Sequence, residues 1–169
     1  MAGETDYMGA CQSALQFTLN ALPLCAGDRA SDVFSVKGVA MVPGVIVQRV
    51  FRTMGAGLDT MAGLNSSFLD GIRRADFYAQ KFGCGNCYEH ASVVYMYLRN
   101  RGIRPITFLG LPNHALVLAG NDHRTDCTDP STFPQRSWVC DAWKKIVYPG
   151  PSFARHESKQ PLPMYVEMD

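Results

Sequence analysis

The chain has 169 residues, of which 47% are hydrophobic and 18% are charged, and its formal net charge is +1. These values indicate a globular protein large enough to bury a core without disulfides, and they exclude a disordered chain. With no block of basic residues, the sequence predicts no nucleic-acid partner.

The first half of the chain reads as helical. Apolar residues recur every three or four positions, which predicts a helix that ends near Pro23, at Met8, Cys11, Leu15, Leu19 and Leu22. Residues 33–47 are β-branched but contain glycine and proline, so their state stays open. A second helical stripe comprises Phe68, Ile72, Ala75, Ala79 and Phe82, with Ser66 or Ser67 as its N-cap.

A third helix is predicted to begin directly after the segment GCGNC at 83–87. Gly83 ends the preceding helix. Asn86 suits the N-cap of the new helix, and Glu89 follows at the spacing of a capping box. Gly102 suits the position just beyond the end of this helix.

After Gly102 the pattern changes to strands, which we expect at 104–111, 114–120 and 137–143, while 144–148 either continues the third strand or pairs with it. Helices followed by a small antiparallel sheet predict an α+β fold. We divide the chain into an N-terminal helical region (1–65), a core (66–150) and an extended C-terminal tail (151–169) that contains several prolines.

Cys87 is the strongest candidate for a catalytic nucleophile. It lies in the first turn of its helix, where free backbone N–H groups and the positive end of the helix dipole favour a thiolate over a thiol. The same N–H groups suit a developing oxyanion. A buried, unreactive cysteine is the alternative interpretation of this position.

A reactive thiol needs a proton acceptor and a group that orients it. His114 begins a predicted strand directly after a turn, which makes it the candidate base. His90 lies on the same helix as Cys87 and is expected either behind the site or at the surface, while His123 and His156 are expected in solvent. Asp141 ends an apolar strand, and we prefer it as the orienting acid over Asp129, which suits a turn.

Three segments resemble a known superfamily: GCGNCYEHA (83–91), NHALVLAG (113–120) and WVCDAW (138–143). They are similar to the Cys, His and Asp blocks of papain-like and transglutaminase-like cysteine hydrolases, and more narrowly to small bacterial toxin and effector domains with blocks of the form GNCGEHA, DHAFV and VVDPW. Tyr88 replaces a glycine of that pattern and Ala142 a proline. The resemblance covers residues 80–148.

The resemblance implies a papain-like or transglutaminase-like core and a Cys-His-Asp triad of Cys87, His114 and Asp141. It implies a deamidase, protease or transamidase of a protein substrate in a target cell, made by a bacterium and secreted by a dedicated system, with a chaperone or immunity protein as a further partner. No cofactor, metal or membrane insertion is expected. The acidic start of the chain predicts no signal peptide, and the producing cell would hold the protein in its cytoplasm.

Three alternatives remain open at the level of sequence. Cys84-Gly-Asn-Cys87 is also a dithiol pattern, which would perform thiol–disulfide exchange. Cys84, Cys87 and His90 suit a zinc site if Cys127 or Cys140 supplies a fourth ligand. A non-catalytic interaction module would use the helical N-terminal half.

Overall fold

The computed structural model describes residues 5–23 and 67–168. This part of the chain is α+β, as predicted. Helices α1 (Tyr7–Ala21), α4 (Phe68–Phe82) and α5 (Cys87–Asn100) precede the strands, and the short helix α6 (Phe153–His156) lies between the last two strands. The segment 33–47 and most of the proposed N-terminal region lie outside the described residues.

The helix boundaries confirm the capping signals in the sequence. Ser67 caps α4, with a hydrogen bond of 3.2 Å from the Asp70 N–H to its hydroxyl. Gly83 ends α4 in the left-handed conformation with φ 65°. Asn86 caps α5 and forms the predicted capping box with Glu89. Gly102, with φ 70°, follows the end of α5. These short signals therefore fix where the helix that carries Cys87 begins and ends.

The sheet is antiparallel and has five strands in the order β4-β3-β2-β1-β5. The strands are β1 (Ile106–Leu111), β2 (His114–Ala119), β3 (Trp138–Asp141), β4 (Ile146–Pro149) and β5 (Leu162–Glu167). The first three confirm the predicted strands, and β4 resolves the open question about 144–148 because it pairs with β3. The β1–β2 hairpin brings Leu111 opposite His114 at one end of the sheet.

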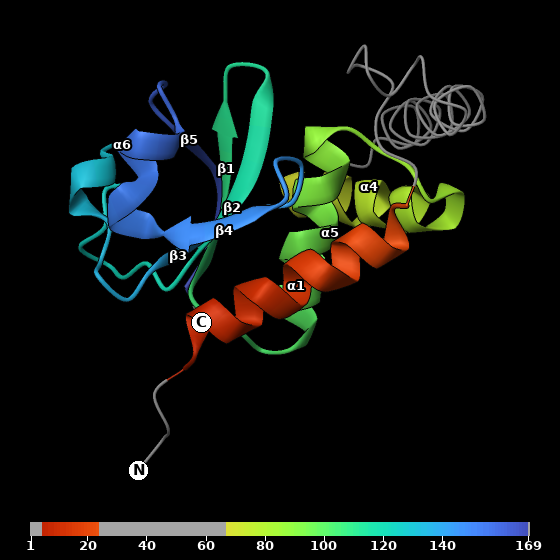
Figure 1. Ribbon diagram of the computed structural model, residues 1–169, viewed down its shortest axis with the longest axis horizontal. Coiled ribbons are helices and arrows are strands. Elements are labelled where there is room, and N and C mark those ends of the chain that lie inside the picture. Colours follow the sequence, from red (N-terminus) through yellow and green to blue (C-terminus); the bar gives the residue numbers. More distant parts are fainter. Residues whose placement is uncertain (1–4, 24–66, 169) are drawn as a thin grey trace.

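The sheet separates two hydrophobic layers. Helices α1, α4 and α5 cover one face, and α6 lies on the other (Figure 1). On the helical side, Phe108 and Val117 pack against Val94 and Tyr95 of α5. On the opposite side, Leu116 and other strand residues meet the loops around α6. Helix α5 is buried along most of its length, so its first turn has a fixed position beside the sheet.

Helix α1 packs with a stripe that overlaps the predicted one only in part, since Cys11 and Leu22 are buried as predicted. Its buried residues are Tyr7, Cys11, Ala14 and Thr18, whereas Met8 is 40% exposed. The ring of Tyr7 covers Gly120, where an added Cβ would lie 2.8 Å from Tyr7 Cδ2. Its hydroxyl donates to the Arg104 carbonyl at 2.8 Å. The close approach of Tyr7 to Gly120 thus adds an aromatic residue to the buried face, which the spacing of aliphatic residues did not indicate.

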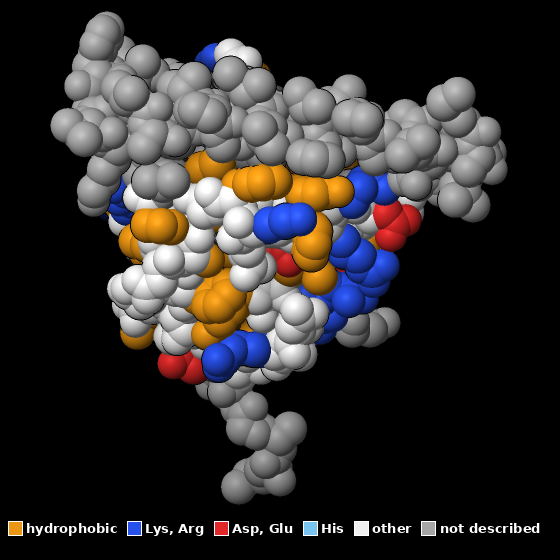
Figure 2. Space-filling model, turned by 90° about the vertical axis from the view of Figure 1, so that its right-hand side faces the viewer, with side chains coloured by type: hydrophobic (Ala, Val, Ile, Leu, Met, Phe, Trp, Pro, Cys, Tyr) orange, Lys and Arg blue, Asp and Glu red, His pale blue; other side chains and the backbone are white. Residues whose placement is uncertain are grey.

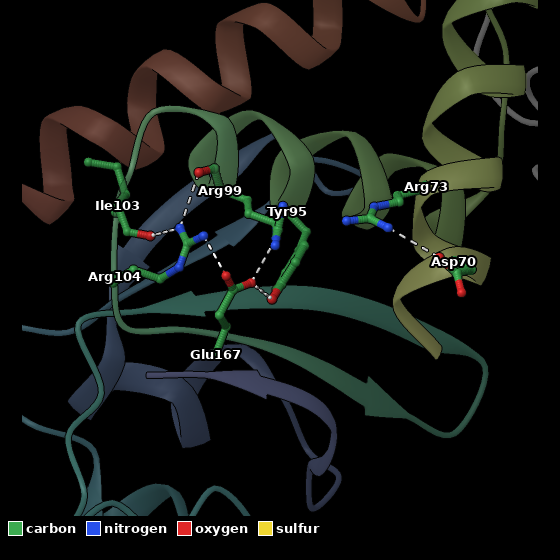
Figure 3. Close-up of polar contacts among 7 residues, drawn as sticks. All are labelled: Asp70, Arg73, Tyr95, Arg99, Ile103, Arg104 and Glu167. Carbon is green, nitrogen blue, oxygen red and sulfur yellow. Dashed lines mark hydrogen bonds and ion pairs between the residues drawn. The ribbon is translucent and has the colours of Figure 1, made fainter. Parts of the chain in front are cut away.

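The segment after Pro149 has more structure than the extended tail that was predicted. It contains α6 and the edge strand β5, which pairs with β1. Glu167 at the end of β5 accepts hydrogen bonds from Tyr95 Oη and Arg99 Nε, both at 2.9 Å, and from Arg104 at 2.5 Å (Figure 3). We call this group of Glu167, Arg99, Arg104 and Tyr95 the β5 clasp, since it ties the last strand to α5.

Figure 2 shows the face that lies to the right in Figure 1. Its described surface mixes hydrophobic side chains with lysine and arginine, and acidic side chains are fewer. None of the helices in the described ranges has the length and apolar character needed to cross a lipid bilayer.

Candidate active site

Cys87 is the first residue of α5 and is partly exposed. The N-cap residue Asn86 accepts a hydrogen bond of 3.0 Å from the Tyr88 N–H, and its own N–H donates to Glu89 Oε2 at 2.9 Å. The cap therefore uses the amide of Tyr88 and leaves the thiol of Cys87 at the positive end of the helix. Cys87 Sγ also lies 3.7 Å from the carbonyl oxygen of Asn113.

His114 lies opposite Cys87, at the start of β2. It follows the tight turn of the β1–β2 hairpin, in which Asn113 has φ 64°. His114 Nε2 is 2.7 Å from Asp141 Oδ2, and the Cys87 side chain is close enough to the imidazole to help raise its pKa. Since Nε2 faces Asp141, Nδ1 is the ring nitrogen that remains for the thiol. The structure thus brings together the three residues that the sequence singled out.

The surroundings of His114 favour its protonated form. Burial of the imidazole lowers its pKa, because a charge is costly away from water. Hydrogen bonds with Asp141 and Cys87, and the negative charge of Asp141, outweigh burial and raise the pKa of His114 from 6.5 to about 9. At neutral pH the imidazole is therefore in its protonated form, between the side chains of Cys87 and Asp141.

Asp141 ends β3 and is fully buried. Its Oδ2 binds His114, and its Oδ1 accepts a hydrogen bond of 2.9 Å from the backbone N–H of Lys144. The turn that supplies this N–H contains Lys145 with φ 63°. Asn113 and Lys145 are the non-glycine residues with positive φ in the described ranges, and both belong to turns at this site. Backbone strain of this kind tends to collect where geometry serves function.

Two residues that sequence analysis did not single out complete the site. The ammonium of Lys144 lies 3.8 Å from Asp141 Oδ2 and pairs with the carboxylate of Glu157. Donor atoms of His114, Asp141 and Glu157 all lie within 4.8 Å of one another. A metal ion would have to displace the Lys144 ammonium from two of these groups, so we assign no metal here. Glu157 lies in the supposed tail, where nothing in the sequence indicated a role.

A shallow pocket of about 190 Å³ lies beside His114. Leu111 and Pro112 of the hairpin line one part of it, and Lys144, Glu157, Ser158 and Lys159 line the rest. The pocket therefore opens on the imidazole from the side of the β3–β4 turn.

The remaining candidates occupy other places. His90 is buried, with its ring against Trp143 and its Nδ1 2.9 Å from the Asn86 carbonyl, so the surface alternative for it was wrong. His123 and His156 are exposed, as predicted. Asp129 caps a short 3-10 helix through the N–H of Ser131, which confirms the turn that the sequence predicted.

The other described cysteines are buried free thiols: Cys11, Cys84, Cys127 and Cys140. Burial raises the pKa of Cys84, and the nearby Glu89 raises it further. Among the described residues, the donor atoms of Cys84, Cys87 and His90 do not come together as a metal site. Cys25 lies outside the residues that the structure describes.

Comparison with known proteins does not identify a family or a curated relative for this chain. No model of a known protein family matches the chain, and no curated protein matches it. The site itself consists of a partly exposed thiol at a helix N-terminus, an imidazole, and a buried carboxylate hydrogen bonded to that imidazole. Such a chain of groups can ionise a thiol and return its proton.

Proposed function

We propose that the protein is a cysteine-dependent amide hydrolase with Cys87 as nucleophile, His114 as base and acid, and Asp141 as the orienting group. The observation that carries this proposal is the grouping of Cys87, His114 and Asp141 from α5, β2 and β3. His114 Nε2 lies 2.7 Å from Asp141 Oδ2, and Cys87 is close enough to the imidazole to help raise its pKa.

The proposed reaction has two halves. The thiol proton resides on His114, and the thiolate adds to an amide carbonyl carbon, with the N–H of Cys87 donating to the oxyanion. His114 then gives its proton to the leaving nitrogen, and a thioester remains. In the second half, water gives a proton to His114 and attacks the thioester, which releases a carboxylic acid and restores the thiol. Asp141 fixes the tautomer of His114 in both halves.

The proposal extends to the type of fold and to the substrate. A cysteine at a helix N-terminus, facing a histidine and an aspartate on neighbouring antiparallel strands, is the arrangement expected of a papain-like or transglutaminase-like core. The similarity of the three sequence blocks to bacterial effector domains points to a protein substrate in a target cell. Glutamine deamidation, peptide cleavage and transamidation share the same thioester, so all three belong to the proposal.

The dithiol alternative has less support. Cys84 is fully buried and its pKa is raised, so it does not suit the attacking thiol of a dithiol pair, which must be accessible and readily ionised. If the dithiol alternative were correct, Cys84→Ser and Cys87→Ser would be equally inactive. The amide hydrolase proposal predicts that Cys84→Ser keeps its activity.

Candidate target proteins treated with wild type, Cys87→Ala and His114→Ala test the proposal by mass spectrometry. We expect wild type to convert glutamine to glutamate, cut a chain or form an isopeptide bond, and each variant to lose roughly a thousandfold or more of that activity. Cys84→Ser is the matched control, and circular dichroism checks that all variants fold. If the Cys87→Ala variant kept its full effect on target cells, the non-catalytic interaction module would be favoured instead.

A further inference from the structure

Four ionisable side chains alternate in sign beside the candidate nucleophile. His114 meets Asp141, Asp141 meets Lys144, and Lys144 meets Glu157. Asp141 is fully buried, and the side chain of Glu157 is only 7% exposed. Two carboxylates this close, with so little access to water, repel each other strongly unless a cation lies between them.

We propose that Lys144 and Glu157 form an internal charge pair that positions Asp141 and sets how tightly His114 holds its proton. This inference rests on the proposed function, because it concerns the same site. Lys144 and Glu157 are positioning residues, since they act on the reacting groups through Asp141 and His114.

Lys144 contacts Asp141 twice, which supports this role. Its backbone N–H binds Oδ1 at 2.9 Å, and its ammonium approaches Oδ2 at 3.8 Å. The ammonium also approaches the His156 carbonyl at 3.5 Å. The first contact holds the rotamer of Asp141 with the oxygen that His114 needs facing the imidazole. The second offsets the charge of Asp141 and so weakens its pull on the His114 proton.

Glu157 offsets Lys144 in turn. It accepts from the ammonium, and Tyr148 Oη lies 3.5 Å from the same oxygen. Without Glu157, an uncompensated lysine would lie next to the Asp141–His114 pair and would weaken protonation of the imidazole. When Lys144 and Glu157 are both present, their charges nearly cancel at the position of His114. The pKa of the imidazole then depends mainly on Asp141 and Cys87.

Two further ionisable groups with shifted pKa values, His90 and Tyr148, lie around the site. His90 on α5 faces Asp141 and Lys145, and burial lowers its pKa. Tyr148 on β4 faces Glu157 and Asp141, and burial raises its pKa. Both therefore remain neutral while His114 titrates. A change in the titration of His114 thus reports on Lys144 and Glu157 and on the coupled thiol of Cys87.

The experiment removes each charge singly and then both together. We expect Lys144→Met to raise the titration midpoint of His114, because two unbalanced carboxylates then favour the imidazolium. We expect Glu157→Gln to lower it, because the remaining lysine disfavours the imidazolium. Each shift should be about half a pH unit or more, since the charges lie close to the ring but Lys144 is partly exposed. The double variant should return to the wild-type midpoint.

The titration midpoint of His114 is measured by NMR of histidine-labelled full-length protein between pH 5 and pH 10.5. Assignment is simple because the chain has 4 histidines. Alkylation of Cys87 by iodoacetamide, followed by mass spectrometry of its peptide, is the second readout. Iodoacetamide is uncharged, so the variants do not attract or repel it. Lys159→Met is the matched control, because Lys159 lines the same pocket from an exposed position and should leave the midpoint unchanged.

Opposite shifts in the single variants, and recovery in the double variant, support the inference, because loss of packing alone would not produce opposite signs. The inference about Lys144 and Glu157 is overturned if the folded variants show no shift of the His114 midpoint, or shifts of the same sign. In that case a wild-type midpoint near 9 still supports the proposed function. A wild-type midpoint near 6.5, with Cys87 alkylated as an ordinary thiol, overturns the thiolate–imidazolium pair and this inference together.

Discussion

The two ends of the sheet each carry a cluster of charged residues, yet the clusters differ in kind. The β5 clasp at one end uses arginines, which hold their charge at any ordinary pH, around the carboxylate of Glu167. Partial burial raises the pKa of Glu167, but hydrogen bonds from Tyr95, Arg104 and Arg99 outweigh this and lower it. The clasp is therefore fixed in charge across the physiological range.

The cluster at the other end uses groups that gain and lose protons. It contains a thiol, an imidazole whose pKa is about 9, and two turns with strained backbone at Asn113 and Lys145. Helix α5 joins the clusters, with Cys87 at its beginning and Arg99 in its last turn. The comparison shows that a group of opposite charges does not by itself indicate a reactive site; the chemistry of its members does.

The strongest test of this contrast removes Glu167. Glu167→Ala leaves Arg99 and Arg104 without their common partner, and we expect a loss of about 3 kcal/mol in the free energy of unfolding, measured by urea denaturation. The exposed Arg73–Asp70 pair, drawn in the same close-up, serves as a control (Figure 3). Arg73→Ala should change the free energy of unfolding little, because this ion pair is exposed to solvent. Similar losses in the two variants would show that the clasp is no more than a surface ion pair.

The second test changes pH instead of sequence. Because folding raises the pKa of His114 from 6.5 to about 9, its contribution to stability is fully present below pH 6.5 and is lost as pH rises through about 9. We expect wild type to lose about 2 kcal/mol of unfolding free energy over that range relative to His114→Gln. Parallel pH profiles for the two proteins, compared by urea denaturation, would contradict the raised pKa.

The smallest effect concerns the turn after Asp141. Lys145→Gly relieves a side chain held at φ 63°, and we expect a gain of up to about 1 kcal/mol in unfolding free energy, partly offset by the flexibility of glycine in the unfolded chain. Lys144→Gly, at the neighbouring position, should bring no such gain. A loss of stability in Lys145→Gly would mean that the lysine side chain contributes contacts that outweigh the strain.

Local signals predicted local structure well. The N-caps Ser67 and Asn86 and the terminating Gly83 were readable because capping depends on a few neighbouring residues. The positions of Cys87, His114 and Asp141 on one helix and two strands were readable for the same reason. That the two strands are neighbours could be expected because they follow one another in the chain, although the long segment 120–137 connects them.

Contacts between distant parts of the chain were harder to predict. Strand β5 contains Pro163, and a proline argues against a strand unless that strand lies at an edge, as this one does. Glu157 reaches Lys144 only after the chain has turned through α6. No sequence periodicity indicates that Glu157 is the partner of Lys144, so this charge pair could be found only from the three-dimensional structure.

The docking of α1 has a practical consequence for anyone who shortens the chain. Tyr7 covers Gly120, and Cys140 Sγ lies 3.6 Å from the Cys11 carbonyl, so the helix seals the sheet beneath the strand that carries Asp141. A truncated protein that starts after Pro23 would leave this apolar surface bare and would tend to aggregate during purification. An affinity tag is therefore better attached ahead of α1 than in its place.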